Sequence, residues 1–145
     1  MTTRQSARSG WAFWAVSLAS LLWNGFGAFD YTMTMIRDPG YLAQFPPEMM
    51  PVIDAFPAWV IVAWACGVWG ALAGSLLLLA RSRFAVLAFV LSLAGLAAST
   101  GFQMSIEMPA SLTTPAMRVM TAAIWAGALF FLWFALRQRR AGTLR

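Results

Sequence analysis

An amide and a carboxylate inside the first long apolar segment are the strongest candidates for chemistry in this chain. Asn24 falls near the middle of segment 11–36, and Asp30 lies about 28 Å along it as a helix. In an apolar environment an ionised carboxylate needs water or a partner, so Asp30 could bind a cation or a proton. Alternatively, Asp30 could accept hydrogen bonds from loop amides or pair with Arg37 or Arg118. Asn24 could contact a substrate, or it could clamp two helices through a serine or a backbone carbonyl.

Further acidic and phenolic side chains follow near the ends of the apolar segments. Glu48, Asp54 and Glu107 could converge with Asp30 in an acidic vestibule, with Tyr31 and Tyr41 as hydrogen-bonding neighbours. Paired carboxylates can perform acid–base chemistry, but no spacing here brings two of them together. Helix capping and solvation would also account for Asp54 and Glu48, and Glu107 could pair with Arg118. The candidate substrate-binding residues are therefore Asn24, Asp30, Tyr31, Glu48 and Glu107.

The residue types that are missing exclude several classes of site. The chain has no histidine and a single cysteine, Cys66. Bis-histidine haem and the common histidine-based metal and acid–base sites are therefore excluded, as are an intramolecular disulfide and a two-thiol redox relay. Cys66 falls inside a span and is interpreted as a small apolar filler. Because no nucleophile–base pair can be assembled either, the sequence predicts no metal, no cofactor and no enzyme activity.

Four apolar segments must position these side chains. The 145 residues are 61% hydrophobic and 10% charged, a composition that one soluble core cannot accommodate. As a helix, segment 11–36 would reach about 39 Å, enough to cross a hydrocarbon core of about 30 Å. We expect spans at about 11–36, 56–80, 84–104 and 115–136. The predicted fold is an all-α membrane protein, an antiparallel four-transmembrane-helix bundle over residues 11–136.

Each expected span carries a narrow stripe of small or hydroxyl side chains at helical spacing. Small residues let helix backbones approach closely, which is the main source of packing energy between helices in lipid. Gly70 and Gly74 form a G-x-x-x-G motif, which could serve a dimer or the packing inside this chain. The predicted helix-packing residues are Ser17, Ser20, Gly27, Gly67, Gly70, Gly74, Ser92, Gly95 and Gly127.

The connection between the first two spans, residues 37–56, is the longest in the chain and is apolar for a loop. Asp38-Pro39-Gly40 is typical of a turn, and Pro46-Pro47-Glu48 is typical of a helix start. We expect a short helix at the membrane surface that folds back over the bundle as a lid. Asp54 would cap the second span or interact with its dipole.

Arginine supplies all ten basic residues and gives a net charge of +5. Eight of the ten fall in tail 1–10, in the connection between the second and third spans, or in tail 137–145. The positive-inside rule places these parts, and so both termini, in the cytoplasm. We expect the arginines to meet anionic lipid heads and not nucleic acid. The arginines expected to contact lipid heads are Arg81, Arg83, Arg137, Arg139 and Arg140.

Four motifs carry a resemblance to a known group of proteins. They are WNxxGxxDYxMT at 23–34, YLxxF at 41–45, FPxW at 56–59 and WAxGVWGxxxGSLLLL at 64–79. Through them, the first two thirds of the chain resembles an uncharacterised family of small four-span bacterial inner-membrane proteins, some loosely labelled "sugar transporter". The resemblance implies a place in the bacterial inner (plasma) membrane and suggests the transport of a small polar solute.

Two functions are compatible with these observations. The chain could be a small carrier or channel for a polar solute, which the polar side of the first span, the lid and the resemblance favour. It could instead be a structural or accessory protein that binds a partner membrane protein or lipid through its outer loop. Against transport, the spans lack a carboxylate at mid-membrane depth, and no helix is visibly broken there. In either case the chain could form a homo-oligomer.

Overall fold

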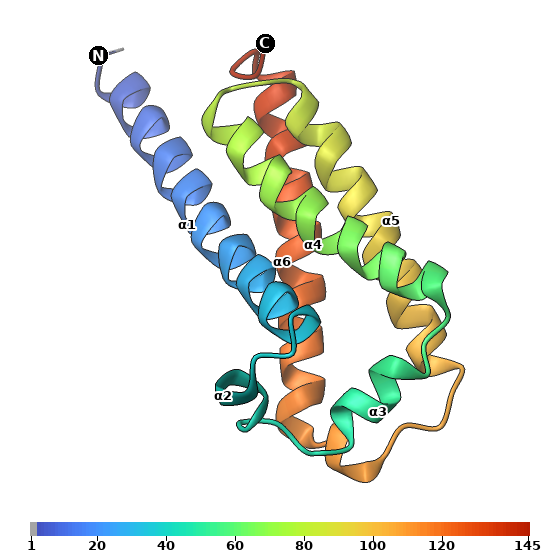
Figure 1. Cartoon of the computed structure of the whole chain (residues 1–145). Helices are drawn as coiled ribbons and strands as arrows, with labels where there is room; N and C mark the ends of the chain where they lie inside the picture. The colour runs from blue at the N-terminus through green and yellow to red at the C-terminus, as the bar shows by residue number, and fades with distance from the viewer. Residues whose placement is uncertain (1–2) are drawn as a thin grey trace.

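The computed structural model describes the backbone of Thr3–Arg145 and the side chains from Gly10 onward. Every regular element in this range is helical: α1 (Thr3–Met35), α2 (Pro39–Leu42), α3 (Met49–Asp54), α4 (Ala58–Leu79), α5 (Phe84–Met104), the 3-10 turn η1 (Ala110–Leu112) and α6 (Pro115–Arg140). The four long helices run alternately up and down (Figure 1). We call the end with the start of α1, the α4–α5 connection and the end of α6 the arginine end. The end that carries α2, α3 and η1 is the loop end.

Four helical segments are long and apolar enough to cross a membrane: Gly10–Met35, Ala58–Leu79, Phe84–Met104 and Pro115–Arg140. The predicted four-helix membrane fold is confirmed. The expected tail 1–10 is helical from Thr3, and α6 continues past the expected end at 136 to Arg140. The 33 residues of α1 span about 50 Å, which exceeds the hydrocarbon core by about 20 Å. The start of α1 therefore extends beyond the apolar layer.

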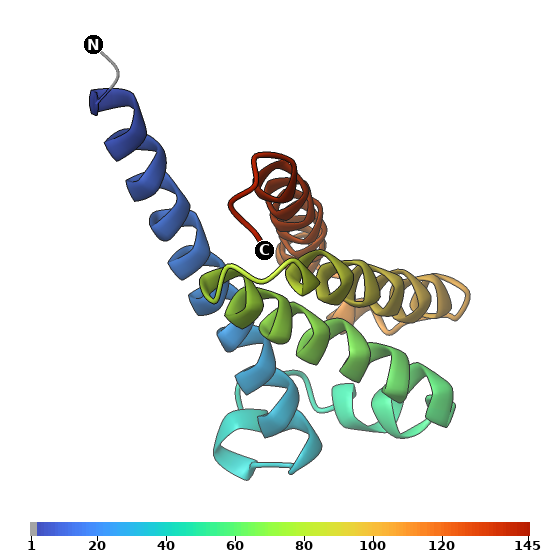
Figure 2. The ribbon, with the colours of Figure 1, turned by 90° about the horizontal axis from the view of Figure 1, so that it is seen from above.

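The helices pack in chain order, with α4 against α5 most closely, α1 against α4, and α6 against α5. Seen from above, α4 and α5 lie side by side as a hairpin (Figure 2). Contact between α1 and α6 is made by large side chains, such as the stacked rings of Phe13 and Phe134 with centroids 6.1 Å apart. The bundle is thus built on one tight hairpin, onto which the first and last helices pack.

Glycine explains the close approach of α4 and α5. A Cβ atom added at Gly95 would lie 2.6 Å from the backbone nitrogen of Gly67, and one added at Gly70 would lie 3.2 Å from the carbonyl oxygen of Ala88. At the same crossing the Ser92 hydroxyl donates a hydrogen bond to the Gly67 carbonyl, at 2.5 Å. The glycines of α4 therefore pack inside this chain, as predicted for the G-x-x-x-G motif in its intramolecular form.

Two further glycines each receive an aromatic ring, and one predicted packing residue contacts no other helix. The ring of Phe89 lies over Gly74, and the indole nitrogen of Trp23 would be 3.2 Å from a Cβ at Gly127. By contrast, a Cβ at Gly27 would meet no heavy atom within 4 Å. The prediction that Gly27 packs against another helix is not met within this chain, because no atom of another helix lies close enough to contact a Cβ at this position.

The apolar core lies at the arginine end of the bundle. It contains side chains from all four long helices, including Phe13, Leu78, Phe89 and Phe134, and it also contains Leu144. Leu144 belongs to the expected basic tail 137–145, yet only 5% of its surface is exposed. The tail therefore continues α6 to Arg140 and then folds back onto the bundle.

Candidate functional site

The polar residues of α1 and α4 meet in a hydrogen-bonded cluster of Ser20, Asn24 and Ser75. The hydroxyl oxygens of Ser20 and Ser75 are 2.7 Å apart, and the Asn24 amide donates to Ser75 at 2.9 Å and to Ser20 at 3.3 Å. Ser75 gives its one hydroxyl hydrogen to the carbonyl of Ala71 at 2.9 Å. Ser75 can therefore only accept from its neighbours, so Ser20 is the donor in the serine pair.

The depth of this cluster follows from the contacts at the arginine end. The guanidinium of Arg81, which follows α4, lies over the rings of Phe13 and Trp14, 5.4 and 5.3 Å from their centroids. Ser75 precedes Arg81 by six residues, about 9 Å of helix, and Asn24 follows Trp14 by ten, about 15 Å. Asn24 therefore lies inside the apolar span, about 9–15 Å from the contact of Arg81 with Phe13 and Trp14. Of its two predicted roles, the structure places it as a clamp between helices that ends on a serine.

Ser17, a predicted packing residue, lies one turn from this cluster and is fully buried. Its hydroxyl oxygen has no hydrogen-bond partner in the described part of the chain. A small hydroxyl without a partner is consistent with a role in helix packing alone. The stripe on α1 therefore separates into a hydrogen-bonding part at Ser20 and Asn24 and a space-filling part at Ser17.

At the loop end, Asp30 accepts a hydrogen bond from the hydroxyl of Tyr41, at 2.5 Å. Asp38 caps α2 and accepts from the backbone N–H of Tyr41 at 2.7 Å, so the expected Asp38-Pro39-Gly40 turn is the start of a helix. Desolvation of the Tyr41 phenol, and its hydrogen bond to the Asp30 carboxylate, raise the pKa of Tyr41 to about 12. Tyr41 thus fastens the connection to the end of α1.

Tyr41, expected as a hydrogen-bonding neighbour, does contact Asp30, but the expected arginine pairing of Asp30 and the expected capping role of Asp54 do not occur. Arg37 makes a bidentate salt bridge with Asp54, with nitrogen–oxygen distances of 2.5 and 3.2 Å, and both side chains are about half exposed. Asp30 therefore pairs with neither Arg37 nor Arg118. Asp54 does not cap α4, whose N-cap is Pro57 without a side-chain hydrogen bond. The reason is the position of Asp54 at the end of α3, where it faces Arg37.

The expected acidic vestibule does not form. Glu48 is the N-cap of α3 without a capping bond and accepts a hydrogen bond from Ser111 at 3.2 Å, which joins the two loops. Glu107 is exposed and makes no salt bridge with Arg118, because Arg37–Asp54 is the only salt bridge among the described side chains. No three acidic, histidine or cysteine side chains gather in the described part of the chain. The carboxylates are therefore distributed over separate contacts.

Tyr31 packs edge-on against Trp64 of α4, with ring centroids 4.9 Å apart. Beyond it, a cavity of about 200 Å³ opens at the loop end, lined by Thr34, Arg37, Asp54 and neighbouring apolar side chains. Of the candidate substrate-binding residues, Asn24, Asp30, Tyr31, Glu48 and Glu107, none lines this cavity. The structure brings Asn24 to Ser75 and Asp30 to Tyr41, and it leaves the five candidates apart.

Ser75 was missed among the predicted site residues, although it carries the only hydroxyl group in α4. That uniqueness is the signal which could have identified it, because a lone hydroxyl in an apolar helix needs a partner. Comparisons with family models, curated proteins and solved structures found no match for this chain.

Proposed function

We propose that this chain is a structural or accessory membrane protein that binds another membrane protein. The observation that carries the proposal is the cluster of Ser20, Asn24 and Ser75, in which the Asn24 amide of α1 is bonded to Ser75 of α4 within the apolar span. A solute path through the bundle would need such groups free to bind solute. Two cavities support the same conclusion, since they lie at opposite ends of the bundle and neither is lined by Asn24.

The first half of α6 is a suitable contact surface for such a partner. The buried residues of α6, Phe131, Phe134 and Ala135, all lie in its second half. In the first half, Val119 is 69% exposed, and small side chains at Ala122 and Ala126 are exposed one turn apart. Small side chains one turn apart allow a second helix to approach closely in lipid. The loops at the same end would extend this contact.

Site-specific photo-crosslinking in native membranes tests the proposal. A photoreactive residue at Ala122 or Ala126 should give a discrete protein adduct, whereas the same probe at Leu87, an exposed position on α5, should not. The adduct mass separates a second copy of this chain from a different protein. Crosslinks to lipid alone at both α6 positions would contradict the proposal, as would adducts of equal yield at Leu87.

Solute transport is the second candidate, and the cavity at the loop end favours it. That cavity is lined by Thr34, Arg37 and Asp54, which could bind a small polar solute, in line with the sugar-transporter label that the resemblance suggests. Uptake of labelled sugars into proteoliposomes would support this function if Asp54→Asn reduced uptake without lowering stability. Failure of the parent protein to move any tested solute would argue against it.

The arginine distribution supports a bacterial inner membrane location with the arginine end in the cytoplasm. Cysteine labelling tests this orientation in a Cys66→Ala background, which removes the only native thiol. A membrane-impermeant maleimide applied outside intact spheroplasts should label Ser111→Cys at the loop end and not Ala141→Cys after α6. Labelling of both positions, or of Ala141→Cys alone, would contradict the orientation.

A further inference from the structure

Arg145 is hydrogen-bonded through its backbone to the connection between α4 and α5. The backbone N–H of Arg145 donates to the carbonyl of Arg81 at 2.8 Å, and the N–H of Arg83 donates to the carbonyl of Arg145 at 2.9 Å. Leu144 is anchored beside them in the apolar core. Arg81 and Arg145, which are 64 residues apart in the chain, thus lie next to each other.

Arg81 occupies a backbone conformation that usually belongs to glycine. Its φ is +55°, and the N–H groups of Arg81 and Ser82 donate back to the carbonyls of Leu78 and Leu77 at 3.0 and 2.8 Å. This pattern closes a helix with a left-handed residue, which disfavours any side chain with a Cβ. An arginine in this unfavourable conformation suggests that its side chain has a function, such as ligand binding, that glycine could not supply.

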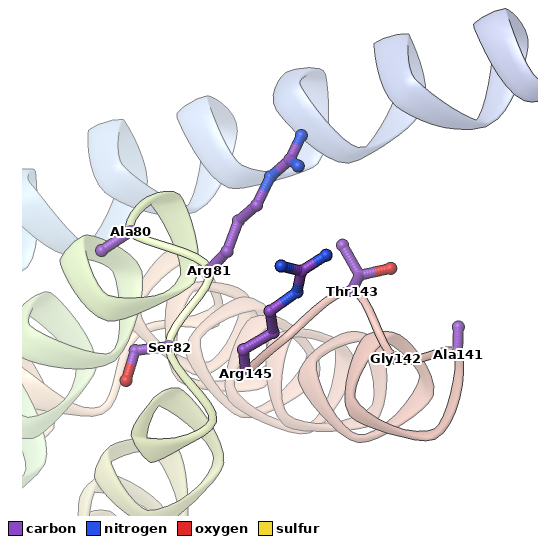
Figure 3. Close-up of a pocket in the computed structure, with 7 residues that line it drawn as sticks. All are labelled: Ala80, Arg81, Ser82, Ala141, Gly142, Thr143 and Arg145. Atoms are coloured by element: carbon purple, nitrogen blue, oxygen red, sulfur yellow. The ribbon is translucent and has the colours of Figure 1, made fainter.

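A cavity of about 500 Å³ lies at this junction, between the end of α6 and the α4–α5 connection. Its lining includes Arg81, Ser82, Thr143 and Arg145. Figure 3 shows the guanidinium groups of Arg81 and Arg145 extending to the same side, toward α1. The guanidinium of Arg81 makes cation–π contacts there with the rings of Phe13 and Trp14. The cavity is therefore a cationic recess beside an interfacial tryptophan.

No acidic side chain among the described residues lines this recess. All five acidic residues of the chain, Asp30, Asp38, Glu48, Asp54 and Glu107, belong to the loop end or to the last turns of α1 before it. Neither Arg81 nor Arg145 makes a salt bridge within the described side chains, and residues 1–9 contain no acid. An anion bound between the guanidinium groups of Arg81 and Arg145 would reduce their mutual repulsion.

We propose that this recess binds the phosphate group of an anionic ligand between Arg81 and Arg145. Guanidinium groups bind phosphate through paired hydrogen bonds, and basic recesses between membrane helices accept lipid head groups. The same chemistry would serve a phospholipid head or a soluble phosphate compound. This site is independent of the proposed contact on α6, which lies at the other end of the bundle.

Binding to the purified, delipidated full chain in detergent tests the proposal. Three probes are titrated and followed by native mass spectrometry or by thermal stability: dioleoyl phosphatidylglycerol, the zwitterionic phosphatidylcholine of the same chain length, and inorganic phosphate. The variants are Arg81→Gly, which keeps the left-handed backbone, Arg81→Lys, and Arg145→Ala. Arg139→Ala is the matched control, since Arg139 is an exposed arginine that does not line the cavity.

Arg81→Gly and Arg145→Ala should each weaken phosphatidylglycerol binding about tenfold, the loss expected for a charge-assisted contact, with a smaller change for Arg139→Ala. The affinity of Arg81→Lys for phosphatidylglycerol should lie between those of the parent protein and Arg81→Gly, because lysine keeps the charge but not the paired hydrogen bonds. If inorganic phosphate displaces phosphatidylglycerol, the ligand is a soluble phosphate compound. If it does not, the ligand is a lipid head group. Equal losses in all variants, or no preference of the parent for phosphatidylglycerol and no binding of phosphate, would overturn the proposal.

Discussion

The side-chain amide of Asn24 on α1 lies 2.9 Å from the hydroxyl oxygen of Ser75 on α4, and this contact joins two residues that are 51 positions apart in the chain. The direction of the bond is determined, because Ser75 already donates to the carbonyl of Ala71. Asn24 must therefore donate its amide hydrogen to Ser75. This bond constrains how α1 is rotated about its axis and how far along α4 it lies. In lipid, no water is present to replace this bond.

Ser75→Ala should lower the stability of the folded protein by about 0.6–1.7 kcal/mol, the range found for hydrogen bonds between membrane helices. Unfolding in increasing fractions of dodecyl sulfate measures this change. The matched control is Ser105→Ala, because the Ser105 hydroxyl bonds only to the carbonyl of Phe102 and is exposed. In a double-mutant cycle, Asn24→Ala should cost less when Ser75 is already alanine. Equal losses for Ser75→Ala and Ser105→Ala, or strict additivity in the cycle, would contradict the clamp.

The four spans were predictable from the sequence, but the relative depth of α1 and α4 was not. Hydropathy and length locate an apolar helix within a few residues, as they do for Phe84–Met104. They do not reveal that α1 begins at Thr3, or that Ser20 of α1 lies level with Ser75 of α4. That alignment of the two helices depends on side-chain contacts such as Arg81 on Phe13 and Trp14.

Gly95→Ala should be strongly destabilising, while Gly101→Ala on the same helix should not. A Cβ at Gly95 would come within 2.6 Å of the backbone nitrogen of Gly67, and backbone cannot move aside as a flexible side chain can. Overpacking of this kind costs about 1–3 kcal/mol or more. At Gly101 a Cβ meets nothing within 4 Å, so the higher helix propensity of alanine should give a neutral or slightly stabilising change. Thermal unfolding of both variants in one detergent compares them directly, and similar melting temperatures would disprove the close crossing of α4 and α5.

Tyr41 should remain protonated at a pH where an ordinary tyrosine has ionised. Its pKa is raised to about 12 from the ordinary 10.0, so the folded state binds the phenolic proton more tightly than the unfolded state does. The resulting stabilisation is fully present below pH 10 and is lost as the pH rises from 10 to about 12. Because the chain has two tyrosines, absorbance titration in a Tyr31→Phe background reports Tyr41 alone.

The same titration after Asp30→Asn isolates the carboxylate from the burial of the phenol. Removing the negative charge should shift the ionisation midpoint of Tyr41 back toward 10.0, because the Asp30 carboxylate no longer accepts the phenolic hydrogen and no longer repels phenolate. A midpoint near 10.0 in the parent protein would show that Tyr41 and Asp30 are not in contact. A midpoint unchanged by Asp30→Asn would assign the whole shift to burial.

The contacts of the acidic residues were only partly accessible to sequence reasoning. The sequence placed Asp30 and Tyr41 near the same end of the bundle, but the choice between Arg37, Arg118 and a phenol as the partner of Asp30 depends on how α2 turns back. That turn is set by Asp38, which caps α2 and thereby directs Tyr41 to Asp30. Arg37 lies within reach of Asp54 instead, because α3 ends beside it.

Arg37→Gly should be about as stable as the parent protein, whereas Arg37→Ala should be less stable than Arg37→Gly by about 1 kcal/mol. Arg37 has a φ of +57° and closes α1 through bonds from the N–H groups of Arg37 and Asp38 to the carbonyls of Thr34 and Met33, at 3.2 and 3.1 Å. Both variants lose the exposed contact with Asp54, worth about 0–1 kcal/mol, but only glycine relieves the left-handed strain. Arg118, an exposed arginine inside α6, is the control, because there glycine should be the less stable replacement by about 1 kcal/mol. Thermal unfolding of the four variants gives the two orders, and the same order at both positions would show that Arg37 is not held in the left-handed conformation.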